Sequence, residues 1–310
     1  MRVVLAATIK SHLAPARTCS RPCGAASRAP GSRFHARARI LAAMAAATSS
    51  LPRHLRPPLK WAGGKRWLVR HVRALWAGYE RRRFVEPFCG GLAVALGLQP
   101  RRALLNDVNP HLVNFYRQLA RGLAIDLPME NASDTYYAYR KIFNALLAAG
   151  AGHTVEAASL FYYLNRTGFN GLCRFNGRGE FNVPFGSYAR IAYVRDFSAY
   201  RRTFSRWEFS SVDFEGLRLK PGDFVYADPP YDVPFTQYAR GRFSWDDQVR
   251  AAEWLARHRG PVVLSNQATP RVVALYEKLG YKMRFLSAPR RISCTGDRTP
   301  AREVLATRNV

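Results

Sequence analysis

The sequence predicts an α/β fold in which helices cover both faces of a mostly parallel sheet. Short apolar runs alternate along most of the chain with segments whose apolar residues recur at helical spacing. In addition, residues 84–110 have the pattern strand, glycine-rich turn, helix, strand and turn. Such a βαβ unit requires parallel strands and a crossover helix. The alternation is interrupted at about 120–205, which indicates an insertion into the sheet domain.

The N-terminal part of this pattern begins with a loop that leads into a helix. The expected elements, in chain order, are a helix from Arg66 to Trp76, a strand, turn and helix over 82–98, and a strand, turn and helix over 102–123. The turn in the first unit holds Gly90 and Gly91. In the second unit Asn109 and Pro110 provide the cap and first residue that helices prefer.

The central part changes character after two helices. Residues 131–150 and 155–169 have helical patterns, whereas 165–188 is dense in Asn, Gly, Arg and aromatic residues and has no period. We therefore expect a loop-rich insertion there. Periodicity then returns, and it predicts strands at 223–227, 260–266, 281–287 and 303–309, with helices at 244–258 and 271–280.

The composition favours a polyanionic partner. The chain has 310 residues, of which 48% are hydrophobic, enough for the core of one large or two modest domains. It carries 48 Lys and Arg against 21 Asp and Glu, a formal charge of +27. A ribosomal-type or arginine-rich composition would also give this balance, but nucleic-acid binding is the functional interpretation. No run of about 18 apolar residues occurs, so no membrane span is expected.

The first 50 residues differ from the rest of the chain. They contain eight Lys or Arg and no acid, and they show neither a helical nor a strand pattern. An organellar transit peptide and an upstream extension with initiation at Met44 are two interpretations. We favour a disordered or artefactual basic tail over residues 1–52.

The cysteines and histidines do not form a metal-binding pattern. Cys19 and Cys23 are spaced as C-x3-C, but no second pair completes a zinc site, and the seven histidines form no H-E-x-x-H motif. We expect reduced cysteines, as in a cytosolic protein, and no metal.

Two strand ends carry candidate ligand-binding residues. In open α/β sheets, ligands bind beyond the carboxyl ends of the strands. "EPFCGG" lies at one such end, where glycines allow close approach of backbone, and Asp107 ends the next strand, where an acid commonly binds ribose hydroxyls. The pattern predicts a nucleoside ligand. A packing turn followed by an N-capping Asp107 is the structural alternative.

The third strand end is "ADPPY", residues 227–231. The carboxylate of Asp228 and the carbonyl of Pro229 could both accept hydrogen bonds from one exocyclic amine, because the two prolines hold them rigidly. Tyr231 could stack on the ring that carries this amine. A proline-rich turn with an N-capping Asp228 is again the alternative.

Seven segments, in order, resemble the DNA adenine methylase family of S-adenosylmethionine-dependent N6-adenine methyltransferases. They are "LKWAGGK" (59–65), "FVEPFCGGLAV" (84–94), "LNDVN" (105–109), "FYYLNRTGFNGLCRFNGRGEFNVPFGSY" (161–188), "YADPPY" (226–231), "VVLSNQ" (262–267) and "RRISCTGDRTPAREVL" (290–305). The resemblance implies a Rossmann-like methyltransferase sheet. It divides the chain into a catalytic domain, 53–120 and 206–310, and a mostly helical and loop DNA-recognition insertion, 121–205.

The resemblance also implies the role of each site residue. The cofactor-binding residues are expected to be Trp61, Lys65, Glu86, Pro87, Phe88, Asp107 and Asp228. The catalytic motif that grips the target adenine comprises Asp228, Pro229, Pro230 and Tyr231. A duplex hides N6 of adenine in the base stack, so the base has to be flipped out. Transfer then depends on positioning and desolvation, with Asp228 as a hydrogen-bond acceptor for the amine.

The insertion is expected to read DNA. Arg174 can bond to O6 and N7 of guanine, the commonest direct base contact. The family places Phe169 and Asn170 near the vacated site and Lys60, Leu172, Pro184 and Tyr188 against flanking bases or backbone; Arg166 and Arg178 are expected to meet phosphates. A GATC-like site in double-stranded DNA is implied.

Some features depart from the family pattern, and other functions stay open. The cofactor turn lacks the Gly-small-Gly-Ser order of many relatives, Phe169 replaces a frequent tyrosine, and the stretch after Tyr231 is short. The alternatives are a modification methylase of a restriction system with another target, a non-catalytic DNA-binding relative, and an RNA or protein methyltransferase. We expect a monomer in the bacterial cytoplasm, associated with the nucleoid, and a phage origin is possible.

Overall fold

The computed structural model describes residues 55–231, 243–288 and 301–310. The predictions for the N-terminal tail, for the short stretch after Tyr231 and for the start of the closing segment lie outside these residues. None of the described helices is both long and apolar enough to cross a membrane.

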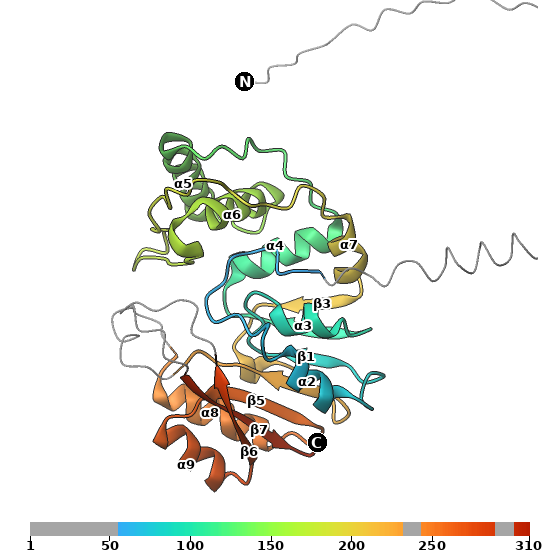
Figure 1. Cartoon of the computed structure of the whole chain (residues 1–310). Coiled ribbons are helices and arrows are strands. Elements are labelled where there is room, and N and C mark those ends of the chain that lie inside the picture. The colour runs from blue at the N-terminus through green and yellow to red at the C-terminus, as the bar shows by residue number, and fades with distance from the viewer. Residues whose placement is uncertain (1–54, 232–242, 289–300) are drawn as a thin grey trace, which may run out of the picture. The chain divides into compact units, whose positions relative to one another are not determined.

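The described chain is built on a seven-stranded sheet with the order β3-β2-β1-β4-β5-β7-β6 (Figure 1). Its strands are β1 (Phe84–Glu86), β2 (Ala103–Asn106), β3 (Trp207–Ser210), β4 (Phe224–Ala227), β5 (Val262–Gln267), β6 (Lys282–Ala288) and β7 (Ala301–Arg308). The first five are parallel, whereas β7 is antiparallel to both of its neighbours. The carboxyl ends of β1, β2 and β4 therefore lie side by side.

Eight α-helices and two 3-10 turns connect the strands within the described residues. They are α2 (Val69–Trp76), α3 (Ala93–Leu98), α4 (Pro110–Arg121), α5 (Ser133–Ala148), α6 (Val155–Thr167), η1 (Phe169–Gly171), α7 (Ser198–Phe204), η2 (Phe214–Gly216), α8 (Trp245–Ala256) and α9 (Pro270–Lys278). Side-chain caps fix several starts, as predicted for α4, where the Asn109 side chain accepts bonds from two backbone N–H groups. Ser244 and Asp247 form a capping box at α8.

The sheet buries both of its faces, so the predicted helices on both faces are confirmed. Phe84 and Phe224 point to one face and pack in the core cluster that includes the buried residues of α2, α3 and α4. Val85 and Val225 alternate to the other face and pack against α8 and α9. The strands β1, β2, β4 and β5 are buried on two sides, which explains their continuous apolar runs.

The connection from β2 to β3 carries the predicted helices and loop-rich segment (Figure 1). After α6 the chain runs from Gly168 to Phe197 with only η1 and two isolated bridges as regular structure. The sequence did not predict α7 or β3, because α7 has seven residues and β3 is a four-residue edge strand that is only partly buried. The exact boundaries of the recognition insertion stay a prediction.

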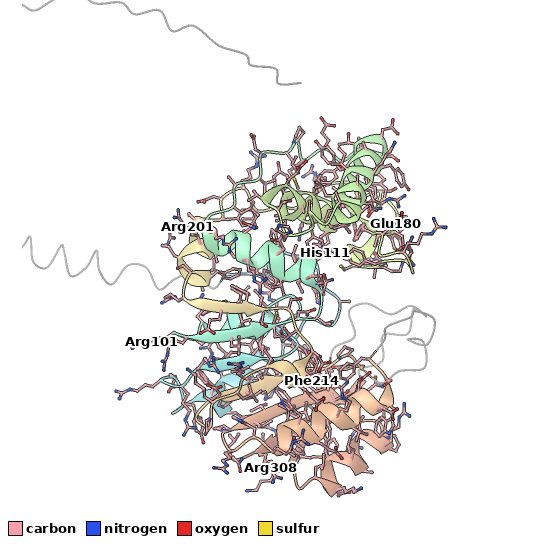
Figure 2. All side chains as sticks on the ribbon, turned by 180° about the vertical axis from the view of Figure 1, so that it is seen from behind. Arg101, His111, Glu180, Arg201, Phe214 and Arg308 are labelled. Carbon is pink, nitrogen blue, oxygen red and sulfur yellow. The ribbon has the colours of Figure 1, made fainter. Side chains whose placement is uncertain are left out.

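Basic side chains project from many parts of this surface. Arg101 and Arg201, for example, are exposed and point outward in Figure 2. The excess charge is thus available to solvent and to a polyanion.

Replacing Phe224 with alanine tests the core between sheet and α2. Phe224 is fully buried and lies edge-on to Trp76, with ring centroids 4.8 Å apart. We expect a loss of about 3–5 kcal/mol in the free energy of unfolding, measured by urea denaturation, because a large cavity is left. Phe285→Ala, at an aromatic residue that is 39% exposed, is the control and should cost no more than about 1 kcal/mol. Similar losses for both would contradict this account of the core.

Candidate active site

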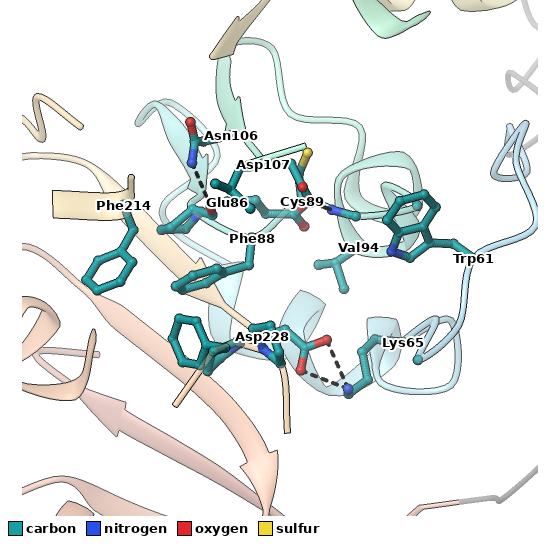
Figure 3. Close-up of a pocket in the computed structure, with 18 of the residues that line it drawn as sticks. Trp61, Lys65, Glu86, Phe88, Cys89, Val94, Asn106, Asp107, Phe214 and Asp228 are labelled. Carbon is teal, nitrogen blue, oxygen red and sulfur yellow. Dashed lines mark hydrogen bonds and ion pairs between the residues drawn. The ribbon is translucent and has the colours of Figure 1, made fainter. Parts of the chain in front are cut away.

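A cavity of about 620 Å³ opens at the carboxyl edge of the sheet (Figure 3). This volume suits a nucleoside-sized ligand. All of the predicted cofactor-binding and catalytic residues line it, namely Trp61, Lys65, Glu86, Pro87, Phe88, Asp107, Asp228, Pro229, Pro230 and Tyr231. The structure therefore brings together three strand ends and the loop before α2, which are up to 170 residues apart in the sequence.

The Trp61 side chain lies over the glycine turn that follows β1. A Cβ at Gly90 would lie 2.8 Å from the Trp61 Nε1, and one at Gly91 would lie 2.8 Å from the Trp61 Cβ. Gly90 also has a positive φ of 41°. Only glycine permits this close approach, so the turn and the indole form one wall of the cavity.

Asp107 braces the same turn. One carboxylate oxygen accepts a bond from the Gly90 N–H at 3.0 Å and the other from the Asn109 N–H at 2.9 Å. Burial raises the pKa of Asp107, and these two bonds partly oppose the rise. Asn109, not Asp107, caps α4, so the N-cap alternative for Asp107 is wrong. Lone pairs of the carboxylate are left for ligand hydroxyls.

Glu86 places an acid deep in the cavity wall. Glu86 is 2% exposed, and no hydrogen-bond partner among the described residues reaches its Oε1. Burial is the main reason that the pKa of Glu86 lies well above its usual value. A buried, unpaired carboxyl oxygen of this kind suits a cationic or hydrogen-bond-donating ligand.

Asp228 is held by two side chains. The Lys65 Nζ lies 2.8 and 2.9 Å from its two carboxylate oxygens, and the Ser265 hydroxyl donates to Oδ1 at 2.9 Å. Burial raises the pKa of Asp228, against the opposing effect of Lys65. Asp228 caps no described helix, so this alternative is wrong too.

The carbonyl groups of Pro229 and Pro230 differ in whether a hydrogen-bond donor of the described chain reaches them. Gln248 donates to the carbonyl of Pro230 at 2.6 Å. Within the described part of the chain no donor reaches the carbonyl of Pro229, which stays available beside Asp228. This is the pair of acceptors that the sequence predicts for an amine.

Tyr231 is oriented by a residue that the sequence analysis missed. Its hydroxyl donates to the two carboxylate oxygens of Glu303 in β7, at 2.7 and 2.6 Å. Glu303 also lies 3.6 Å from the Lys65 Nζ. Both Ser265 and Glu303 belong to segments that resemble the family, but no local pattern distinguishes them from other buried strand residues.

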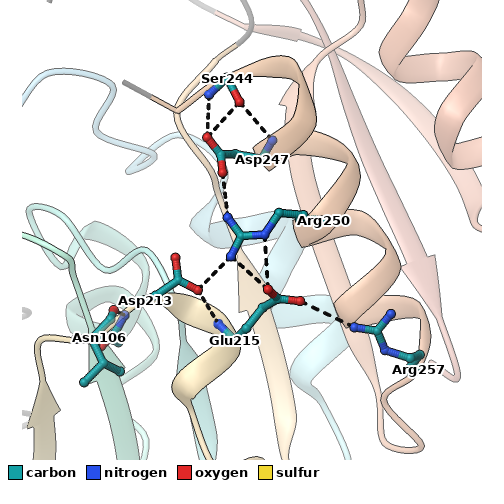
Figure 4. Close-up of polar contacts among 8 residues, drawn as sticks. Asn106, Asp213, Glu215, Ser244, Asp247, Arg250 and Arg257 are labelled. Atoms are coloured by element: carbon teal, nitrogen blue, oxygen red, sulfur yellow. Dashed lines mark hydrogen bonds and ion pairs between the residues drawn. The ribbon is translucent and has the colours of Figure 1, made fainter. Parts of the chain in front are cut away.

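The far end of the cavity is lined by the predicted Phe88 together with residues that the sequence analysis missed. Phe88, Phe214 and Phe243 form an aromatic cluster there, with ring centroids 5.4–6.1 Å apart. Beside it, Arg250 of α8 bonds to Asp213, Glu215 and Asp247 (Figure 4). This ion-pair cluster ties η2 to the first turns of α8 and so fixes the aromatic end.

The loop before α2 is joined by Asn165 to residues 161–188, called here the recognition segment after the role that its sequence predicts. The Lys60 N–H donates to the Asn165 side chain and the Lys60 carbonyl accepts from it, each at 2.8 Å. The Lys60 Nζ donates to the Arg166 carbonyl and lies 3.4 Å from the centre of the Tyr188 ring. Two of the predicted DNA-binding residues, Lys60 and Tyr188, are therefore in contact.

The other predicted DNA-binding residues lie at the surface around η1. Phe169 and Leu172 are 46% and 36% exposed, and Asn170 between them has a positive φ of 51°. Pro184 is also exposed, and its carbonyl accepts from the Phe169 N–H. None of these residues lines the cavity.

The basic residues of the recognition segment differ in their orientation. Arg174 is exposed and donates to Asn182 through Nε and Nη2, which leaves its other N–H groups available. Arg178 is exposed, whereas Arg166 is turned inward toward the Ala192 carbonyl. The phosphate contact predicted for Arg166 is therefore not favoured by its placement.

The sheet and its cavity define a class of protein. A mostly parallel sheet in which antiparallel β7 lies between β5 and β6, with an acidic nucleoside-sized cavity at its carboxyl edge, agrees with the Rossmann-like methyltransferase fold expected from the sequence. The profile of the D12 class N6 adenine-specific DNA methyltransferases matches residues 61–287, and the chain belongs to this family.

Individual relatives agree with this assignment. The chain is 35% identical to the DNA adenine methylase of Vibrio cholerae (classical strain O395), over 80% of this chain and 94% of that protein. It is 35% identical to the type II methyltransferase M1.LlaDCHI of Lactococcus lactis, over 72% and 85%. It is also 35% identical to the DNA N-6-adenine-methyltransferase of phage P1, over 79% of this chain but only 34% of that larger protein.

The protein accordingly methylates adenine in DNA at N6 and uses S-adenosylmethionine as its methyl donor. The cavity fits this cofactor. It offers a glycine cradle under Trp61, a carboxylate on Asp107 and an unpaired carboxyl oxygen on Glu86. These groups match a ligand with a purine, ribose hydroxyls and cationic groups.

Gly91→Ala should weaken cofactor binding. The new Cβ would collide with the Trp61 Cβ and displace the indole from the cavity wall. We expect S-adenosylmethionine affinity, measured by calorimetry, to fall at least about 10-fold, which is 1.4 kcal/mol. Gly64→Ala is the matched control, because it lines the same cavity and its Cβ would meet only the Trp61 carbonyl at 3.7 Å. Unchanged affinity in Gly91→Ala would show that Trp61 is not part of the binding site.

Proposed function

We propose that the protein methylates adenine within a GATC-like site of duplex DNA after flipping the base out of the helix. This would make it a site-specific adenine DNA methyltransferase of class EC 2.1.1.72. The observation that carries the proposal is the acceptor pair of Asp228 and Pro229 beside the Tyr231 ring, at the edge of a cofactor-sized cavity. A base within a duplex cannot reach this pair.

The chain's residues act on the target base by positioning. Asp228 and the Pro229 carbonyl accept the two N–H bonds of the amine, and Tyr231 stacks on the ring. S-adenosylmethionine supplies an electrophilic methyl group, whose transfer forms a C–N bond, breaks an S–C bond and releases one amine proton. Cofactor contacts are assigned to Trp61, Lys65, Glu86, Pro87, Phe88 and Asp107, which all line the cavity. No covalent intermediate is needed.

The recognition segment reads the flanking sequence. Phe169 and Asn170 enter the space of the flipped base, and Arg174 bonds to a guanine. Lys60, Leu172, Pro184 and Tyr188 contact neighbouring bases or backbone. Five of these residues are exposed outside the cavity, which supports a surface for duplex DNA: Phe169, Asn170, Leu172, Arg174 and Pro184. In this scheme residues 121–205 form the recognition insertion, and the protein works as a monomer, without a metal, on the bacterial nucleoid.

A second candidate is a modification methylase of a restriction system with another target. The similarity to a type II methyltransferase of Lactococcus lactis favours it. The cavity and Asp228 would then have the same roles, and only the sequence read by the recognition segment would differ.

Expression in a methylase-deficient bacterial host separates these functions. DNA from the host is digested with paired methyl-sensitive and methyl-dependent nucleases that cut at GATC. If the protein methylates GATC, the DNA should resist the methyl-sensitive nuclease and should be cut by the methyl-dependent one. If the protein is soluble and digestion is unchanged, the GATC proposal fails. Mapping of 6-methyladenine across the host genome then shows whether another site is methylated.

Asp228→Asn should strongly slow transfer and leave DNA binding intact. The variant keeps the shape of the side chain but replaces one acceptor oxygen with a donor. We expect kcat to fall about 10²- to 10³-fold, the usual loss when a preorganised polar group is removed. Binding to duplex DNA should change less than about threefold. Asp246→Asn, at an exposed carboxylate of α8, is the control. Equal losses of DNA binding and transfer would make Asp228 a structural residue.

Arg174→Ala should relax specificity at one base pair. Loss of a bidentate guanine contact costs about 1–3 kcal/mol of discrimination. The measurement is kcat/KM on duplexes that differ at each position of the site. Arg178→Ala, in the same exposed segment, should instead weaken binding to all sequences and reduce its salt dependence. A uniform loss in Arg174→Ala would identify a phosphate contact.

DNA binding should weaken as the pH rises above about 8. Burial, with a contribution from nearby Arg166, lowers the pKa of Lys60 from 10.5 to about 8. Above this pH the free protein loses the ammonium charge that attracts phosphate, so affinity should fall between pH 8 and 10. In Lys60→Arg the charge persists, since guanidinium does not titrate there, and this pH dependence should disappear. Equal pH profiles for the two proteins would exclude Lys60 as its source.

A further inference from the structure

The ammonium group of Lys65 occupies the place that the proposed function assigns to the target base. Its Nζ bonds to both carboxylate oxygens of Asp228 and lies 4.4 Å from the centre of the Tyr231 ring. An adenine that stacks on this ring face and donates to Asp228 therefore has to displace the ammonium. The Lys65 side chain is only 6% exposed, so water does not readily solvate its displaced ammonium group.

Displacement of Lys65 would be costly without a second partner. A buried charge that loses its only counterion is strongly destabilising, because nothing compensates for its lost hydration. The structure provides another carboxylate at a short distance, because the Glu303 Oε1 lies 3.6 Å from the Lys65 Nζ. The Glu303 side chain is 2% exposed, and its position in β7 is fixed by hydrogen-bonded strands on both sides.

We propose that Glu303 is a positioning residue that takes over the Lys65 ammonium from Asp228 when the target adenine enters. Lys65 then changes from occupying the empty base site to pairing with Glu303, and Asp228 becomes free to accept the amine. This inference rests on the proposed function, in which Asp228 and Tyr231 hold the base.

The chemistry of the three side chains suits this exchange. Lysine carries a compact charge with three donors on a flexible stem, so its ammonium can move from the Asp228 carboxylate, at 2.8 Å, to the Glu303 carboxylate, at 3.6 Å. Glu303 already accepts the Tyr231 hydroxyl, but this hydroxyl supplies one proton and leaves further lone pairs for the ammonium. Glu303 can thus orient Tyr231 and receive Lys65 together.

The substitution Glu303→Gln distinguishes the contact of Glu303 with the Tyr231 hydroxyl from its contact with the Lys65 ammonium. Glutamine keeps an acceptor for the Tyr231 hydroxyl and nearly the same volume, but it lacks the charge that attracts the ammonium. The assay uses a duplex that wild-type protein methylates, found by mapping methylated DNA from the expression host. Single-turnover transfer is measured on the natural duplex, and base entry is measured by the fluorescence of 2-aminopurine placed at the target adenine.

The expected result is a loss of at least about 10-fold in the transfer rate of Glu303→Gln, with less base entry and unchanged cofactor affinity. Glu303→Asp, which retains the charge, should recover part of the rate. Lys65→Met removes the group that fills the site, and should increase base entry at equal DNA occupancy. In the Lys65→Met background, Glu303→Gln should have no further effect on base entry, because the two residues act through one exchange.

The controls separate this proposal from simpler ones. A wild-type rate in Glu303→Gln would overturn it, and so would decreased base entry in Lys65→Met. If the effect of Glu303→Gln vanished in a Tyr231→Phe background and persisted in Lys65→Met, Glu303 would only anchor the tyrosine. A wild-type protein that neither methylates DNA nor gives a 2-aminopurine signal would refute the proposed function itself.

Discussion

The arrangement of the active site depends on one constraint, which is that parallel strands end at the same edge of a sheet. β1, β2 and β4 are neighbours, so the residues that follow them converge although they are far apart in sequence. Glu86, Asp107 and Asp228 come from these three strand ends. Because a helix crosses back after each strand, the edge is left open for ligands, and it is where the cavity forms.

The exposed residues around η1 are linked to this edge through Lys60. Asn165 binds the backbone of Lys60 on both sides, and a Cβ at Gly171 would lie only 2.2 Å from the Lys60 Cβ. Lys60 is followed directly by Trp61, and Lys65 at the cavity lies five residues after Lys60. A change in the residues around η1 therefore has a short covalent route to the Lys65 side chain in the cavity.

The sequence predicted those features that depend on local chemistry. The prolines after Asp228, the glycines after β1 and the Asn109–Pro110 cap each demand a particular backbone, so their positions could be deduced without a structure. Glu303 and Ser265 could not be found this way, since their importance comes only from strand pairing that places β5 beside β4 and β7 beside β5. The Arg250 cluster and the edge strand β3 were missed for the same reason: surface charges and short strands have no distinctive local pattern.

The distribution of charge separates the two ligands of the enzyme. The chain has only 21 acidic residues among 310, yet Glu86, Asp107 and Asp228 all line one cavity, and Glu303 lies directly behind it. Lys65 is the one basic residue among the cavity-lining side chains of the described chain, so the carboxylates outnumber it there. A cationic sulfonium cofactor is favoured inside, whereas the basic exterior attracts phosphate. The ammonium of Lys65 contributes to this charge balance. Whether it pairs with Asp228 or with Glu303, it partly compensates the buried negative charge, and the other carboxylate is left free.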